Sequence, residues 1–315
     1  MFLNRLGLAF IVIVGSWAGA AIADEPLLLR YKFAKGDALN YRATHEEKQH
    51  QTILDQKVEN TTTQEVVTSQ VVDEIDGDGN AILKTKTVSQ KRKTDGQSKF
   101  EFDSKSTERD TSSEIGAAAT PILERLTGSE YQVKVTPRGY VSEVKGFFEI
   151  IADLAKEKPS GPILAGVIAD NEGHTVAEQE HFIIFSEKPV SPGDNWDYSY
   201  EVPLKGLGKV TGKSTYTYEG NDKVGERKTV RIGVKSDLTI DFDMEILGVK
   251  LTGTMTTTNA TGTAQFDPAA GRIVSSKNTS TMTGPLKVEV GGMTLELGNS
   301  QDDTRTVELL DKLPE

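Results

Sequence analysis

The 315-residue chain has no cysteine, few aromatic residues (7%) and an excess of acidic side chains. Without cysteine it forms no disulfide, and it cannot be a lipoprotein that is lipidated on an N-terminal cysteine. The net charge of −11, with no Lys/Arg run interleaved with aromatics, argues against nucleic acid as a partner. Beyond the N-terminus no apolar run approaches about 20 residues, so we expect no transmembrane span after signal cleavage.

Residues 1–23 have the three parts of a secretory signal peptide. Asn4 and Arg5 form a short positive region, residues 6–14 are apolar, and the sequence AIA at 21–23 is a small-x-small cleavage site. Retention of the segment as an uncleaved anchor is the alternative. Because an exported chain of this length without disulfides favours a bacterial source, we expect the periplasm or the extracellular side of a bacterial envelope.

The remaining chain predicts two strand-rich regions around a helical connector. Apolar residues at 143–156 recur at the spacing of one helical face, with charged residues opposite. We therefore expect a mainly β fold with a central helical insert (β+α), in which two tandem curved antiparallel sheets or half-barrels pack on helices. The expected domains are a first β-rich half at 24–142, the helical connector at 143–185 and a second β-rich half at 186–315.

Local patterns predict individual turns, strands and one short helix. Residues 29–33 and 39–43 alternate apolar and polar side chains around a Gly-Asp turn at 36–37, which indicates an opening hairpin. Ser113 or Thr111 should cap a short helix that ends at Gly128. A second Gly-Asp turn at 193–194 and two further repeated landmarks predict a tandem duplication, with chance similarity of hairpins as the alternative.

Two groups resemble metal sites. Asp76 to Asn80 begin like a calcium loop, but Ala81 stands where glycine is needed, so we predict a simple turn. His174, Glu178 and His181 would share one face of a helix and could hold a metal ion. A solvated polar face is the favoured interpretation of these three residues.

The sequence also lacks an identifiable catalytic group. Asp241, Asp243 and Glu245 alternate along one strand and are interpreted as its water-facing side. No serine lies in a nucleophile elbow, and neither His45 nor His50 has an identifiable triad partner. We therefore expect a protein that is not an enzyme, with no catalytic residue, no metal site and no cofactor.

Two motifs resemble a family of exported bacterial proteins of uncharacterised function. One is the opening Phe-x-x-Gly-Asp-x-x-x-Tyr from Phe33 to Tyr41, and the other is Pro-Val-x-x-Gly-Asp-x-Trp from Pro189 to Trp196. The resemblance spans most of residues 26–311. More remotely, such chains are similar to lipoprotein-localisation factors, which implies a curved antiparallel sheet forming an open half-barrel, covered by helices around an apolar cavity.

The leading hypothesis is a non-enzymatic envelope protein that binds an apolar small molecule or lipid in a half-barrel cavity. The residues expected to line this cavity are aromatic or aliphatic: Phe147, Phe148, Ile151, Phe182, Trp196, Tyr198 and Tyr200. The same residues could instead form a filled core, which is the favoured interpretation. The alternative function is a structural or protein-interaction module that binds another envelope protein.

Overall fold

The computed structural model describes residues 25–53, 56–97, 99–111, 113–147, 149–150, 153, 179, 181–204, 208–246 and 248–314. The predicted signal peptide and residues 154–178 of the predicted connector lie outside the described residues. The described strands are β1 (Ala38–Ile53), β2 (Gln56–Ile75), β3 (Ala81–Gly96), β4 (Phe100–Asp103), β5 (Glu130–Val135), β6 (Val141–Lys145), β7 (Asn195–Leu204), β8 (Gly208–Val224), β9 (Arg227–Ile246), β10 (Val249–Asp267), β11 (Arg272–Val290) and β12 (Met293–Leu310). The described helix is α1 (Glu114–Leu126).

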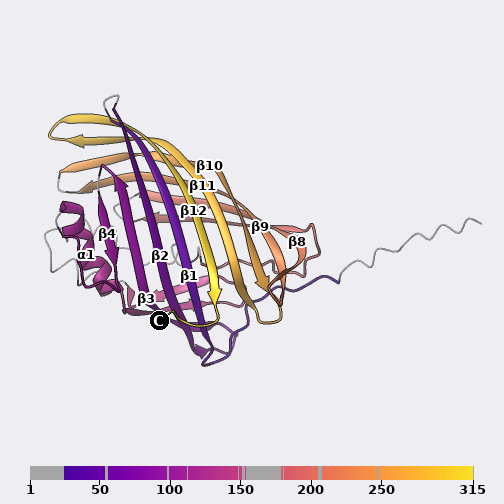
Figure 1. Cartoon of the computed structure of the whole chain (residues 1–315). Coiled ribbons are helices and arrows are strands. Elements are labelled where there is room, and N and C mark those ends of the chain that lie inside the picture. The colour runs from indigo at the N-terminus through magenta and orange to yellow at the C-terminus, as the bar shows by residue number, and fades with distance from the viewer. Residues whose placement is uncertain are drawn as a thin grey trace, which may run out of the picture.

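All of these strands belong to one antiparallel sheet, which confirms the mainly β fold. The order is β6-β5-β3-β2-β1-β12-β11-β10-β9-β8-β7, and β4 pairs with β3 outside this path. The first and last strands, β1 and β12, pair in its middle, from Asn40 opposite Leu310 to Ile53 opposite Leu297. Figure 1 shows the long strands curving together. The expectation of two separate sheets was wrong, because pairing between the terminal strands joins the two strand-rich regions.

The segment at 27–33 does not form the predicted opening hairpin. It makes one isolated bridge, between Leu27 and Val190, and its alternating side chains Leu29 and Tyr31 are buried against other strands. The alternation therefore reflects one buried face and not strand pairing. The buried residues of this first cluster are Leu29, Tyr31, Ile183, Phe185, Val190, Tyr216, Tyr218, Val230, Ile232, Ala264, Phe266 and Ile273.

A second buried cluster lies under β2, β3, β5 and β6. It consists of Val72, Ala81, Leu83, Val133, Val135, Val141 and Val144. Phe33 and Phe182 pack against both clusters. The apolar interior is therefore continuous from the first strand-rich region to the second.

The predicted helical connector begins later than expected. Glu143, Val144 and Lys145 belong to β6, and Val144 is 7% exposed because it packs with Val133 across the β5–β6 hairpin. Residues 147, 149, 150 and 153 are helical. The start predicted at residue 143 was wrong because the valine that fits one helical face fits the inner face of a strand equally well.

The short helix α1 confirms the sequence prediction. Its N-cap is Ser113, whose Oγ accepts a hydrogen bond from the Gly116 N–H at 2.9 Å. Leu123 packs on Phe100 and Phe102 of β4, so α1 covers this strand (Figure 1). Within the part of the chain that the structure describes, no helix has both the length and the hydropathy needed to span a bilayer.

The two Gly-Asp turns make equivalent backbone hydrogen bonds. Gly36 N–H donates to Val72 O, and Val72 N–H donates to Asp37 O, at 2.8 and 2.9 Å. In the second region Gly193 N–H donates to the Tyr218 carbonyl and Tyr218 N–H donates to Asp194 O, at 2.7 and 2.9 Å. The turns therefore fix corresponding strands in the same way, although the tandem duplication stays a prediction.

Candidate functional site

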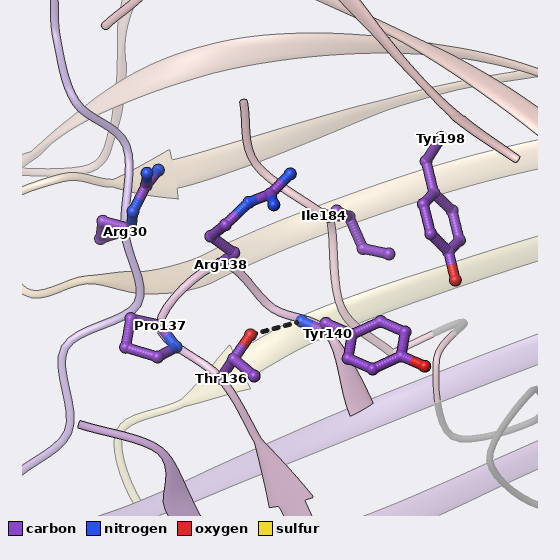
Figure 2. A pocket seen from close by; sticks show the side chains of 7 residues that line it. All are labelled: Arg30, Thr136, Pro137, Arg138, Tyr140, Ile184 and Tyr198. Atoms are coloured by element: carbon purple, nitrogen blue, oxygen red, sulfur yellow. Dashed lines mark hydrogen bonds between the residues drawn. The ribbon is translucent and has the colours of Figure 1, made fainter. Parts of the chain in front are cut away.

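A pocket of about 450 Å³ lies between residues from opposite ends of the strand order. The turn between β5 and β6 forms one side, β7 contributes the other, and the segments around residues 30 and 184 complete it (Figure 2). The lining residues are Arg30, Thr136, Pro137, Arg138, Tyr140, Ile184 and Tyr198. Ligand-binding pockets in proteins commonly measure about 300–1,000 Å³. The pocket is therefore large enough for a small organic molecule.

The β5–β6 turn owes its position to Gly139. This residue has φ +88°, and its N–H donates to Thr136 O at 2.8 Å. A Cβ at this position would lie 2.1 Å from the Ile183 carbonyl oxygen, so only glycine allows the turn to pack so closely on this segment. Phe185 N–H donates to Arg138 O at 2.8 Å and fixes the contact.

Two arginines enter the pocket from distant parts of the chain and hold the same backbone segment. Arg30 Nη1 donates to Ser186 O at 2.7 Å, and Arg30 Nη2 donates to Glu187 O at 3.0 Å. Arg138 Nε donates to Phe185 O at 3.0 Å. Figure 2 shows both guanidinium groups on the same side of the pocket.

The arginine pair carries more positive charge than its surroundings neutralise. Arg138 Nη1 pairs with the carboxylate of Glu187 at 2.8 Å. Desolvation and the neighbouring charge of Arg138 lower the pKa of Arg30, while Glu187 partly opposes the shift. Among the described residues, Glu187 is the one carboxylate paired with either guanidinium. Two cations and one anion leave a net charge of about +1, which suits an additional anionic group.

The rest of the lining is aromatic and aliphatic. Ile184 is 4% exposed, and Figure 2 shows its side chain between the rings of Tyr140 and Tyr198. Desolvation, with Tyr140 and Tyr216 nearby, raises the pKa of Tyr198. Tyr198 therefore carries a neutral phenol at neutral pH, and both tyrosines offer ring surface with a polar tip. The pocket joins a cationic wall to a largely apolar one.

The residues that the sequence placed around a cavity lie in different surroundings. Phe147 packs edge-on against Tyr131 with ring centroids 5.1 Å apart, and Phe182 packs against Tyr31 at 5.6 Å. Trp196 stacks on Tyr216 at 5.7 Å. Phe148 and Ile151 lie outside the described residues.

The aromatic row on β7 shares one face, as its alternation predicts. Trp196, Tyr198 and Tyr200 are each more buried than the residues between them. Tyr198 lines the pocket, whereas Tyr200 lines a second hollow of about 460 Å³ along β7, β8 and β9. Trp196 Nε1 donates to Ile184 O at 2.6 Å and supports the floor of the first pocket.

Sequence reasoning missed Arg30, Arg138 and Tyr140. Arg30 alternates with buried residues and resembles an ordinary strand residue, and Arg138 is the middle of a Pro-Arg-Gly turn. No local signal connects Arg30 and Arg138, because they are 108 positions apart in sequence and both donate to backbone carbonyls of residues 185–187. A Gly at 139 is the single sign that the turn makes a close backbone contact.

A separate apolar cluster lies on β9 to β12, away from the pocket. Its buried members are Met255, Met282 and Leu286, with Leu238, Ile240, Phe242, Leu251 and Leu297 packed around them. Asp241 faces away from this cluster, and its carboxylate accepts a hydrogen bond from Thr254 Oγ1 at 2.7 Å. The alternation predicted for this strand therefore separates apolar from acidic side chains.

The candidate metal group near the connector is only partly described. His174 and Glu178 lie outside the described residues. The His181 ring lies 3.1 Å from Arg305 Nη2, so a cationic guanidinium lies beside it. The sequence-based preference for a polar face there stays a prediction.

Comparison with solved structures gives low similarity over most of the chain. Lipovitellin, from a structure entitled "Lipid-protein interactions in lipovitellin", is 10% identical with a TM-score of 0.43; the match covers 90% of this chain and 26% of lipovitellin's. The chain thus spans about a quarter of that protein's length. Pseudomonas aeruginosa OccK5 (OpdH) is 4% identical with a TM-score of 0.25, covering 88% and 100% of the two chains. The Pseudomonas putida F1 COG4313 outer membrane channel is 7% identical with a TM-score of 0.22, covering 91% and 98%.

These structural scores are too low to carry an argument about ligand or role. No curated protein matches the sequence. A family model does match, over residues 78–273, which is more than half of the chain and includes the β5–β6 turn and Tyr198. The chain belongs to the family of unknown function DUF6263.

Proposed function

We propose that this protein is a non-enzymatic binding protein of the bacterial envelope, and that its pocket takes an amphiphile with an anionic group and an apolar tail. The observation that carries the proposal is the pair Arg30 and Arg138 beside an apolar wall, with one paired carboxylate, that of Glu187 on Arg138. A guanidinium binds a carboxylate or phosphate through parallel hydrogen bonds. Tyr140, Ile184 and Tyr198 would contact the tail.

The composition of the lining supports binding and not catalysis. None of the seven lining residues is a histidine, an aspartate or a glutamate, so the pocket wall offers no paired general acid and base. The signal-like features of residues 1–23 support export. The protein would then meet amphiphiles, such as fatty acids or lipids, in the envelope.

Isothermal titration calorimetry with dodecanoate and with uncharged dodecanol tests the proposal. Dodecanoate should bind the wild type with one site, and dodecanol should bind at least about tenfold more weakly because it lacks the anion. Arg138→Gln should weaken the binding of dodecanoate at least about tenfold and leave the binding of dodecanol nearly unchanged. Tyr198→Ala should weaken both ligands, because it removes apolar contact.

Arg227→Gln is the matched control. Arg227 is an arginine that pairs with Asp311 at 2.7 Å and does not line the pocket. The Arg227→Gln variant should bind dodecanoate and dodecanol as the wild type does. Circular dichroism of each variant checks that the sheet is intact. If dodecanoate and dodecanol bind equally, or if neither binds, the proposal is overturned in favour of the interaction module.

A further inference from the structure

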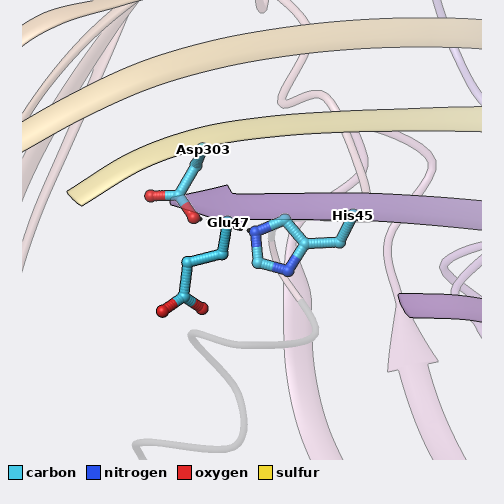
Figure 3. A group of neighbouring side chains, drawn as sticks. All are labelled: His45, Glu47 and Asp303. Carbon is cyan, nitrogen blue, oxygen red and sulfur yellow. Dashed lines mark hydrogen bonds and ion pairs between the residues drawn. The ribbon is translucent and has the colours of Figure 1, made fainter. Parts of the chain in front are cut away.

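Three side chains with metal-binding atoms meet near the middle of the sheet, and none of them lines the pocket. His45 and Glu47 are two residues apart on β1, so they project from the same face. Asp303 of β12 lies directly opposite Glu47 in the strand register. Figure 3 shows the imidazole and the two carboxylates gathered beside these strands.

The distances suit a single small ion. One ligand atom from each residue lies within 4.8 Å of the others, and all three residues are partly buried. His45 Nε2 and Asp303 Oδ1 are 2.8 Å apart. Bonds of about 2.1 Å in a tetrahedral site place ligand atoms about 3.4 Å apart. Small side-chain rotations would therefore bring all three atoms onto one ion.

The charges favour a cation at this position. Glu47 and Asp303 are carboxylates directly across a strand pair, an arrangement that is repulsive without a positive partner. Within the described residues, no lysine or arginine pairs with Glu47. Arg305 lies opposite His45, and its guanidinium reaches His181 at 3.1 Å. Among the described residues, the carboxylates of Glu47 and Asp303 and the guanidinium of Arg305 add up to a net charge of about −1.

A neighbouring amide already orients one of the carboxylates. Gln301 Nε2 donates to both oxygens of Asp303, at 3.1 and 3.0 Å. Hydrogen bonds of this kind commonly hold metal ligands in place and contribute to affinity. Asp303 is therefore fixed on the shared face of β12 before any ion binds.

We propose that His45, Glu47 and Asp303 bind a divalent transition-metal ion, with Zn²⁺ as the best match. Imidazole nitrogen and carboxylate oxygen are both zinc ligands, and three protein ligands leave a fourth position for water. A simple His45–Asp303 ion pair would explain two of the residues. It leaves Glu47, directly opposite Asp303, with no cationic partner of its own among the described residues.

Calorimetry of the purified chain without a polyhistidine tag, titrated with Zn²⁺ at pH 7, tests the site. The wild type should bind one ion. His45→Ala and the nearly isosteric Glu47→Gln should each weaken binding at least about 100-fold, and Gln301→Ala about tenfold. Substitution of Co²⁺ should give the wild type an intense visible spectrum typical of four-coordinate cobalt, which either ligand variant should lose.

His50→Ala is the matched control. His50 is also on β1, but it projects from the opposite face, and its two ring nitrogens point to different acids, Glu59 at 3.3 Å and Asp302 at 3.9 Å. This variant should keep wild-type affinity and the cobalt spectrum. The proposal is overturned if the wild type does not bind Zn²⁺ one-to-one. It is also overturned if His50→Ala loses as much Zn²⁺ affinity as His45→Ala and Glu47→Gln. Unchanged affinity in both His45→Ala and Glu47→Gln overturns it as well, and amphiphile binding in the pocket is unaffected by any of these results.

Discussion

Asp76 illustrates how one side chain can fix a turn. Its carboxylate accepts hydrogen bonds from the Asn80 side chain, from Asn80 N–H and from Asp78 N–H, each at 3.0 Å. Lys134 Nζ of β5 lies 3.0 Å away. The Asn80 amide and Lys134 hold the pKa of Asp76 well below its usual value. The turn that resembles a calcium loop is thus closed by the protein's own donors.

The lowered pKa of Asp76 predicts a pH-dependent stability. In the unfolded chain an aspartate titrates near pH 3.9, so the stabilisation is complete above that value and is lost as the pH falls toward the lower folded-state pKa. Asp76→Asn should therefore lower the melting temperature at pH 7, and the difference from wild type should shrink below about pH 4. Differential scanning fluorimetry of both proteins from pH 7 to pH 3 measures this difference in melting temperature.

Asp78→Asn is the control for this prediction. Its carboxylate accepts none of the hydrogen bonds that close the turn, although it lies two residues from Asp76. This variant should differ little from wild type at any pH. A melting-temperature difference for Asp76→Asn that is the same at pH 7 and pH 3 would contradict the assignment.

The β5–β6 turn is the element on which the pocket depends. It places Arg138 and Tyr140 on the lining, and it contacts the segment that both arginines hold. Tyr31 N–H also donates to Pro137 O at 2.8 Å, which ties the turn to the N-terminal segment. A small displacement of the turn would therefore move both the cationic and the aromatic walls.

Gly139→Ala should destabilise the protein by about 3 kcal/mol or more. The substitution combines a left-handed backbone, at φ +88°, with a Cβ placed 2.1 Å from Ile183 O and 2.6 Å from the Tyr31 ring. Gly225→Ala is the control, since φ is +57° and nothing lies within 4 Å of its Cβ. It should cost only about 1 kcal/mol. Urea unfolding measures both, and equal losses would falsify the close-contact argument.

At the scale of the whole molecule, the two predicted strand-rich regions share one sheet. The β1–β12 pairing joins the two regions at the centre, and Phe33 and Phe182 connect the two buried clusters. A fold of this kind should unfold as one cooperative unit, because neither region keeps a complete sheet without the other. Two tandem domains would instead unfold independently.

Leu83→Ala tests this cooperativity. Leu83 is fully buried in the first region, so its truncation should cost about 2–5 kcal/mol. In a Trp17→Phe background, Trp196 is the single tryptophan and reports on the second region. The unfolding midpoint from Trp196 fluorescence should fall together with the midpoint from circular dichroism. Lys86 is exposed on the same strand, and Lys86→Ala is the control. It should change the free energy of unfolding reported by either probe by no more than about 0.5 kcal/mol.

An unchanged Trp196 midpoint in Leu83→Ala would contradict a single cooperative unit. It would instead favour the two β-rich halves at 24–142 and 186–315 as independent domains. The comparison is informative because Leu83 and Trp196 pack with different buried clusters. Energetic coupling between them can therefore arise only through the shared sheet and the residues that bridge the clusters.

Local chemistry made several features predictable. The cap at Ser113, the turns at Gly36 and Gly193, and the turn closed by Asp76 each depend on residues within a few positions, or on backbone preferences of glycine. The alternation on β7 also identified the inward face of Trp196. Local patterns failed at residues 29–33, where the burial of alternate side chains resembles a paired strand. They also failed at Val144, whose spacing fits both a helical face and the inner face of a strand.

The sequence by itself determined the mainly β composition, the positions of the tight turns and the alternation of inner and outer faces. Only the tertiary structure decided which strands are neighbours, and therefore which side chains meet. Arg30 meets Arg138 because both hold the backbone of residues 185–187, and His45 meets Asp303 because the β1–β12 pairing sets the register of these strands. Register depends on hydrogen bonds and packing between segments hundreds of residues apart, for which a local sequence pattern carries no signal.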